Sequence, residues 1–359
     1  MVKKKFLSIQ IKNENFMISI QQSNHLKSIA ILMMLCLHLF NTLDYEGLFE
    51  PLIYLGEKPL IYYISLFSDA CVPIFAFVSG YGSYFKFQQN QFAYWTDNLK
   101  RLKKLYLNYW VIIFLFPVAL GLLLHKEDYP GSIFTLIENL LAVNTSYNGA
   151  WWFFTIYVLF VLTSSFWFKL LDKINSYCYL LALLCLYLIS FYLRVYKPLN
   201  YSIPIFNWFH TQAALYGCTL FQFMLGAFAL RFNWNIIWAN FFKSIKNKVV
   251  LFALGTILLL FAHGLVTNFI IAPFTALVFL FLFTQVRLNQ FFCKILDFFT
   301  PHATNIWLVH MFFYMIFFKS FIYSTHYVLL IFLLLVFCCI GSSIVVNKIN
   351  NVVLQLVKI

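Results

Sequence analysis

Two titratable side chains occur within the first long apolar run of this sequence. The run LKSIAILMMLCLHLF (26–40) contains Lys27 near its start and His38 near its end. At 1.5 Å per residue the two lie about 16 Å apart along a helix, so they could contact opposite ends of one long ligand but not each other. His38 is a candidate general base. The structural alternative is a histidine bonded to a backbone carbonyl and a lysine that reaches the interface.

Asp69 is the only acidic residue that we place inside an apolar run long enough to cross a membrane. An unpaired carboxylate at that depth is unfavourable, so it needs a partner. His38 is one candidate, because neighbouring antiparallel helices would bring the two to similar depths. A hydroxyl partner or a water-filled outer vestibule would also satisfy Asp69. The sequence leaves these alternatives open.

A second group of residues could bind a phosphate-bearing ligand. The second apolar run ends in VSGYGS, with Ser79 and Gly80, and the segment NLKRLKKLYL that follows contains Arg101 and Lys104. Small residues permit close approach, and cationic side chains bind phosphates. Together with Lys27 they would lie at the inner membrane face. A basic cluster there could also be only a signal for membrane topology.

The composition indicates which elements carry these residues. With 62% hydrophobic residues, 10% charged residues and a mean hydropathy of +0.81, the chain is predicted to be an all-α, polytopic membrane helical bundle. Polar breaks divide it into ten expected spans, with a possible interfacial helix near 132–142. The spans are expected at 26–43, 60–85, 105–124, 150–168, 177–193, 208–230, 249–264, 266–285, 303–320 and 327–346.

The distribution of charge predicts the orientation of these spans. Ten spans place most of the 25 Lys and Arg residues on one side, which predicts that both termini are cytoplasmic. Residues 1–25 and 347–359 are then cytoplasmic tails around a transmembrane domain at 26–346. This arrangement explains the net charge of +13 without a nucleic-acid partner. The eight cysteines show no metal-binding spacing, so we expect no metal site.

These motifs, in this order, resemble the bacterial acyltransferase 3 family of integral membrane O-acyltransferases in its stand-alone form. The family's first span carries a basic residue, ten intervening residues and a histidine, which match Lys27 and His38 here. FAFVSGY (75–81) is similar to the end of the family's second span, and Arg101-Leu-Lys-Lys104 resembles its RxxR entry to the third. Weaker similarities lie at GAWWFFTIYVLF (149–160), FMLGAFAL (223–230) and NIWLVH (305–310).

The resemblance implies an activity and roles for residues. The enzyme would O-acetylate a sugar hydroxyl of a surface polysaccharide, or of its lipid-linked precursor, in the inner (plasma) membrane, surrounded by membrane lipid. Acetyl-CoA, or another acyl-CoA, would be a co-substrate, with no bound cofactor. Lys27, Ser79, Gly80, Arg101 and Lys104 would bind it. Lysine at 27 and 104 replaces the commoner arginine, so a point charge stands where a bidentate fork is usual.

His38, assisted by Asp69, would act as a general base or carry the acyl group transiently. Trp151, Trp152 and His310 are candidates for the acceptor site. An aromatic belt at the interface would equally explain the tryptophans, and a structural hydrogen bond would explain His310. The alternative function is a glycan or lipid transporter, a flippase or permease, in which Asp69 and His38 would form a translocation relay.

Overall fold

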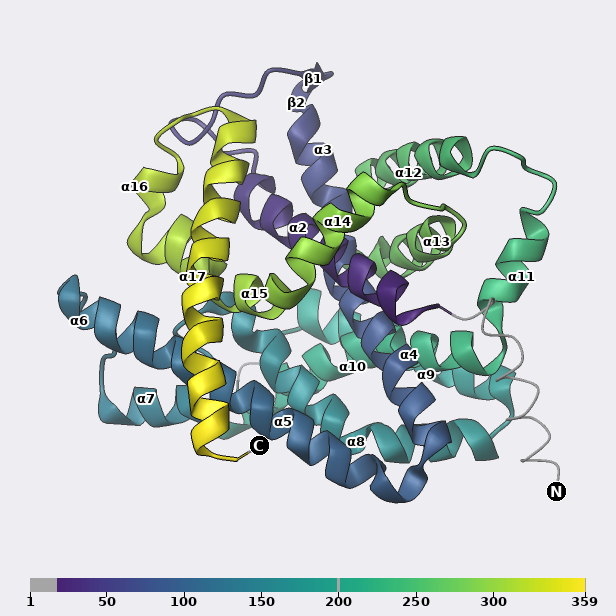
Figure 1. Cartoon of the computed structure of the whole chain (residues 1–359), viewed down its shortest axis with the longest axis horizontal. Coiled ribbons are helices and arrows are strands. Elements are labelled where there is room, and N and C mark those ends of the chain that lie inside the picture. The colour runs from purple at the N-terminus through teal and green to yellow at the C-terminus, as the bar shows by residue number, and fades with distance from the viewer. Residues whose placement is uncertain (1–17, 199–200, 359) are drawn as a thin grey trace.

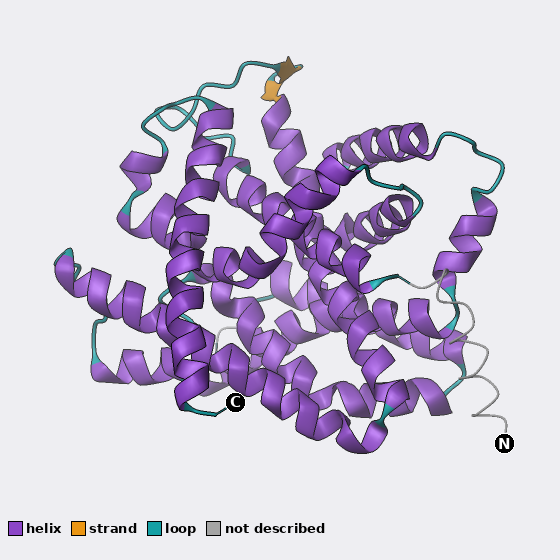
Figure 2. Cartoon of the chain, viewed as in Figure 1, coloured by secondary structure: helices purple, strands orange, loops and turns teal. Residues whose placement is uncertain are grey.

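A computed structural model describes residues 18–198 and 201–358 and confirms the all-α polytopic bundle. Helices make up almost the whole described chain, as Figure 2 shows. The one β-hairpin within the described residues is small. It pairs Tyr54 with Pro59 and Leu55 with Lys58 in an antiparallel arrangement.

The first half of the chain forms helices joined mostly by short turns (Figure 1). Its elements are α2 (Ile20–Phe40), β1 (Tyr54–Leu55), β2 (Lys58–Pro59), α3 (Leu60–Phe67), η2 (Ser68–Ala70), α4 (Cys71–Gln89), α5 (Gln91–Ile113), η3 (Phe114–Leu120), α6 (Gly121–Leu123), α7 (Ile133–Leu140), η4 (Gly149–Trp151), α8 (Trp152–Lys173) and α9 (Ser176–Val195). The second half contains α10 (Pro204–Arg231), α11 (Trp234–Phe241), α12 (Lys248–Leu265), η5 (Phe269–Ile271), α13 (Ala272–Thr284), α14 (Gln290–Phe299), η6 (Thr300–His302), α15 (Ala303–Met311), η7 (Phe312–Phe317), α16 (Lys319–Ile322) and α17 (Val328–Leu356).

Eight helices of the described chain are long and apolar enough to cross a membrane. They correspond to the first seven expected spans and the tenth. The eighth corresponds to a shorter apolar helix, Phe269–Thr284, and the ninth to α15 continued by the π-helix η7. Both α13 and α15 are largely buried in the bundle. Their short length is tolerated because protein, and not lipid, surrounds most of their backbone. A helix, α7, is present where the sequence suggested a possible interfacial one.

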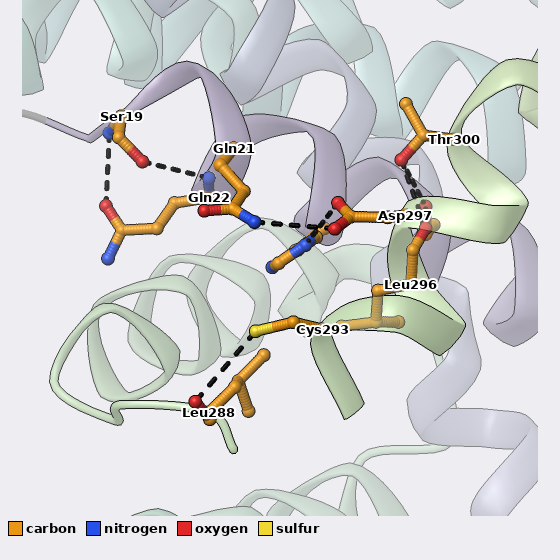
Figure 3. Close-up of polar contacts among 10 residues, drawn as sticks. Ser19, Gln21, Gln22, Leu288, Cys293, Leu296, Asp297 and Thr300 are labelled. Atoms are coloured by element: carbon orange, nitrogen blue, oxygen red, sulfur yellow. Dashed lines mark hydrogen bonds and ion pairs between the residues drawn. The ribbon is translucent and has the colours of Figure 1, made fainter. Parts of the chain in front are cut away.

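Helix α2, which carries Lys27 and His38, begins at Ile20, six residues before the expected span. A capping box defines this start: the hydroxyl of Ser19 accepts from the amide of Gln22, and the Gln22 side chain accepts from the amide of Ser19. Gln21 also donates to Asp297 of α14 (3.4 Å; Figure 3). Part of the expected amino-terminal tail is thus helix packed on the bundle. At the other end, α17 continues as helix to Leu356, through most of the expected carboxy-terminal tail.

The most extensive helix–helix packing joins α4 and α10, near the centre of the bundle. Two glycines bring their backbones together. A Cβ added at Gly80 of α4 would overlap the carbonyl of Phe223, and one added at Gly226 of α10 would overlap the carbonyl of Phe77. Because α2 packs against α4, this contact also positions the helix that carries His38.

Replacing Gly80 with alanine should therefore destabilise the bundle. The methyl group would force α4 and α10 apart, at a cost of about 1–3 kcal/mol for an overpacked site. We expect a lower melting temperature for the detergent-purified Gly80→Ala variant. Gly82→Ala, on the same helix, is the matched control, because a Cβ at Gly82 meets nothing within 4 Å. Equal melting temperatures for the two variants would contradict the proposed close contact.

Candidate active site

A cavity of about 570 Å³ lies within the bundle and brings together residues from distant parts of the sequence. Helices α2, α4, α5, α8, α9, α15 and α17 all contribute to its wall. Its lining includes seven of the predicted site residues: Lys27, His38, Asp69, Ser79, Arg101, Lys104 and Trp152. The size is typical of a ligand-binding pocket.

Positive charge gathers on the side of the cavity formed by the beginning of α2 and by α5. We call this side the inner end, because the sequence predicts that its basic residues lie at the inner membrane face. Lys27 of α2 faces it together with Arg101 and Lys104 of α5. Arg101 donates through Nη2 to Asn98 (2.9 Å), and its guanidinium carbon lies 5.9 Å from the ring centre of Tyr157. Its buried Nε has no hydrogen-bond partner among the described residues. A cation held in this way retains a donor for a ligand.

His38 lies in the last turn of α2, at the opposite part of the cavity. Its Nδ1 lies 3.3 Å from the hydroxyl of Tyr314. The ring centre of His310 lies 4.9 Å from that of His38. With Nδ1 engaged by Tyr314, Nε2 is the nitrogen of His38 left for chemistry at the cavity.

His310 itself is fully buried and does not line the cavity. Its Nδ1 lies 2.7 Å from the carbonyl of Trp307 and must donate to it, because a carbonyl only accepts. Its Nε2 has no partner among the described residues. The sequence proposed His310 for the acceptor site. In the structure its ring packs against that of His38 and does not line the cavity.

Asp69 lies in η2, between α3 and α4, and faces the cavity. Among the described residues, the hydrogen bond of the His38 ring is to Tyr314, and Asp69 is not joined to it. Arg194 lines the same cavity as Asp69, although no ion pair joins the two among the described residues. The alternatives that the sequence left open for Asp69 did not include a nearby cation.

Arg194 lies one residue beyond the expected span at 177–193, but it belongs to the last turn of α9 and lines the cavity. Its guanidinium carbon lies 5.4 Å from the ring centre of Trp152 and 4.8 Å from that of Phe269. These are distances at which cation–π attraction operates. No motif marked Arg194, because only the fold brings it next to Asp69.

A network of amides also escaped the sequence analysis. Asn108 of α5 donates to Asn305 of α15 (2.7 Å), which donates to Asn347 of α17 (2.8 Å) and to Ser343 (3.1 Å). All three asparagines line the cavity. The network ties three helices around it and satisfies polar groups that would otherwise be buried without partners. Asn108 and Asn305 lie within expected spans and were the available signal, whereas Asn347 is the first residue of the expected carboxy-terminal tail.

Besides His310, two other predicted residues lie outside the cavity wall. Gly80 faces Phe223 of α10 and serves helix packing. Trp151 is fully buried, its indole Nε1 donates to the carbonyl of Leu308 (2.9 Å), and its ring packs on Tyr109. Ser79 and Trp152, their neighbours in sequence, do face the cavity. Helical geometry separates adjacent residues in this way, since each turns about 100° from the last.

Comparison with known families agrees with this arrangement. A family model described as an acyltransferase domain, that of the acyltransferase 3 family, matches residues 20–347. No curated protein and no solved structure matches the chain. The matched region extends from the first residue of α2 to Asn347 and so includes every residue that lines the cavity. The chain therefore belongs to the acyltransferase 3 family and is a multi-pass membrane acyltransferase.

Proposed function

We propose that this protein transfers an acetyl group from acetyl-CoA to a sugar hydroxyl of a surface polysaccharide or its lipid-linked precursor. The observation that carries the proposal is that the cavity described above has cations at its inner end and His38 at its opposite end. The reaction would take place in the bacterial inner membrane, with acyl-CoA and a glycan as the two partners. The finer identity of donor and acceptor rests on the resemblance and on the chemistry of the cavity wall.

The inner end suits the phosphates of coenzyme A. Lys27, Arg101 and Lys104 supply three positive charges there, and Arg101 has a donor to spare. The wall between this end and His38 is mostly apolar, with Met34, Leu37 and Leu105 among its members. It suits the extended pantetheine arm, because apolar surface binds methylene groups by their removal from water. The thioester would then lie near His38.

His38 would act on the acceptor hydroxyl in one of two ways. As a general base, Nε2 takes the hydroxyl proton while the oxygen attacks the thioester carbonyl; the intermediate then expels the thiolate of coenzyme A, which takes up the proton. As a carrier, Nε2 attacks the carbonyl first and expels the thiolate of coenzyme A; the acceptor hydroxyl then displaces the acyl group from the ring, and its proton goes to the thiolate. In both routes Tyr314 holds the ring by Nδ1.

Loss of His38 should remove nearly all transfer. General base assistance typically contributes about 10²- to 10⁴-fold, so we expect His38→Ala to lower transfer by that order. The measurement is incorporation of radiolabelled acetyl from acetyl-CoA into the surface glycan fraction, in membranes with matched expression. The control is His125→Asn, because His125 lies in a loop with φ of 50°, which asparagine tolerates. Full activity of His38→Ala would exclude His38 from the chemistry.

Donor phosphates should depend on Arg101. A charge-assisted hydrogen bond contributes about 1.5–3 kcal/mol, so Arg101→Ala should raise KM for acetyl-CoA roughly 10- to 150-fold. Acetyl-pantetheine, which has no phosphates, should show the same KM with the wild-type protein and the variant. Lys103→Ala is the matched control, because Lys103 is an exposed neighbour outside the cavity wall. An equal rise in KM for both donors would mean that Arg101 does not bind phosphate.

Tyr314 should orient His38 without binding either substrate. Removing one neutral hydrogen bond costs about 0.5–1.5 kcal/mol, so Tyr314→Phe should lower kcat roughly 2- to 13-fold. KM for acetyl-CoA should stay unchanged, since Tyr314 is outside the cavity wall. Steady-state kinetics with varied acetyl-CoA separate the two constants. A change confined to KM would contradict an orienting role.

A further inference from the structure

A second, smaller cavity of about 300 Å³ lies next to the first one. It is lined by Asn41, Leu66, Asp69, Val195, His263, Thr267, Asn268 and Phe269. Asn41 follows the end of α2, Val195 ends α9, and Thr267 and Asn268 follow α12. These chain segments meet at the end of the bundle opposite the inner end, so we call this the outer cavity.

Two charged residues form the boundary between the cavities. Asp69 lines both of them. Arg194 lines the central cavity, and its guanidinium group lies between Trp152 of the central wall and Phe269 of the outer wall. A molecule in the outer cavity is therefore separated from the central cavity by the Asp69 and Arg194 side chains.

His263 provides an independent sign of a ligand. It lines the outer cavity and is 1% exposed. Its Nδ1 lies 3.2 Å from the hydroxyl of Thr275, while Nε2 has no hydrogen-bond partner among the described residues. A buried polar atom without a partner costs about 1–3 kcal/mol, so such atoms in native proteins call for a partner outside the chain.

We propose that the outer cavity binds a neutral, hydroxyl-rich sugar ring of the acceptor, with His263 as a hydrogen-bond partner. The inference rests on the proposed function and adds the place where the acceptor binds. Amides, a hydroxyl, an imidazole and a carboxylate offer both donors and acceptors to sugar hydroxyls. Leu66, Val195 and Phe269 offer apolar surface to the ring. The charged residue of this wall is Asp69, which disfavours an acidic ring, and the amides and the hydroxyl around it are uncharged and suit a neutral one.

The position explains how the acceptor would reach the thioester. One hydroxyl of the bound ring would extend past Asp69 into the central cavity, toward His38. The donor and the acceptor would then occupy separate cavities and meet only at this boundary. Of the three acceptor candidates from the sequence, Trp151 and His310 are fully buried and line neither cavity, whereas Trp152 lines the central one.

The test measures binding of the two substrates separately, on the full chain purified in detergent. The probes are acetyl-CoA and the glycan fraction extracted from the source organism's envelope, and the readout is the shift in melting temperature that each causes. His263→Leu should weaken the apparent affinity for the glycan at least 10-fold, while the acetyl-CoA shift is retained. The retained shift also shows that the variant folds. The fold should tolerate this change, because the Thr275 hydroxyl keeps its bond to the carbonyl of Ala272.

Two further variants sharpen the result. Thr267→Val, in the exposed wall of the outer cavity, should weaken glycan binding in the same direction. Thr256→Val is the matched control on α12, because the Thr256 hydroxyl bonds only to the carbonyl of Phe252 (2.8 Å) and lines neither cavity. A glycan shift that His263→Leu leaves intact, or that is absent from the wild-type protein, would overturn the inference.

Failure of the inference is distinguishable from failure of the proposed function. Transfer of labelled acetyl to the same glycan fraction is measured in parallel. Transfer without any effect of His263→Leu on the glycan dependence overturns the outer subsite alone. In a further outcome, the glycan shifts the melting temperature of the wild-type protein and not that of His263→Leu, while the wild-type protein transfers no acetyl group from acetyl-CoA. That result supports a sugar site and refutes the acetyl-CoA reaction, and it is the result expected of a transporter.

Discussion

The backbone contact between α4 and α10 sets the geometry on which both cavities depend. At Gly80 and at Gly226, a carbonyl group of the opposite helix occupies the space that a side chain would need. In a membrane, helices associate by close packing, because lipid provides no hydrophobic drive between them. Helix α10 is accordingly buried along most of its second half, and α4 presents its other side to α2. The wall that holds Ser79 and the wall that holds His38 are thus fixed relative to each other.

Polar groups inside this bundle are arranged in two different ways. Where they maintain the fold, they are paired: Asn108, Asn305 and Asn347 bond in series across three helices. These asparagines also line the central cavity; by contrast, Nε of Arg101 and Nε2 of His263 belong to cavity-lining residues and have no partner among the described residues. Because a charged residue in a span costs about 2.5–3.5 kcal/mol, side chains such as Lys27 and Asp69 are expected where a cavity or a ligand compensates for the loss of water. Unpartnered polar atoms of residues that line a cavity, unlike Nε2 of His310, therefore indicate a site for a ligand.

The two cavities give a physical basis for a reaction between substrates that arrive from different sides. The central cavity presents cations at its inner end, and the outer cavity presents uncharged polar groups beside Asp69. Arg194 joins them by contacting an aromatic ring from each. An anionic donor and a neutral acceptor would each be favoured in only one of these places. His38, held by Tyr314, lies on the central side of the boundary.

The sequence by itself determined the fold class, the family and seven residues of the central wall. Apolar runs near the length of a bilayer specify helices wherever they occur, and rare ionisable residues within them identify Lys27, His38 and Asp69. The sequence did not predict the short lengths of α13 and α15, because a helix that is buried against protein need not span the lipid. Tertiary structure alone decided that Gly80 packs on α10 while Ser79 faces the cavity. It also decided that Arg194 lines the central cavity together with Asp69, since contacts between distant helices leave no periodic mark in a sequence.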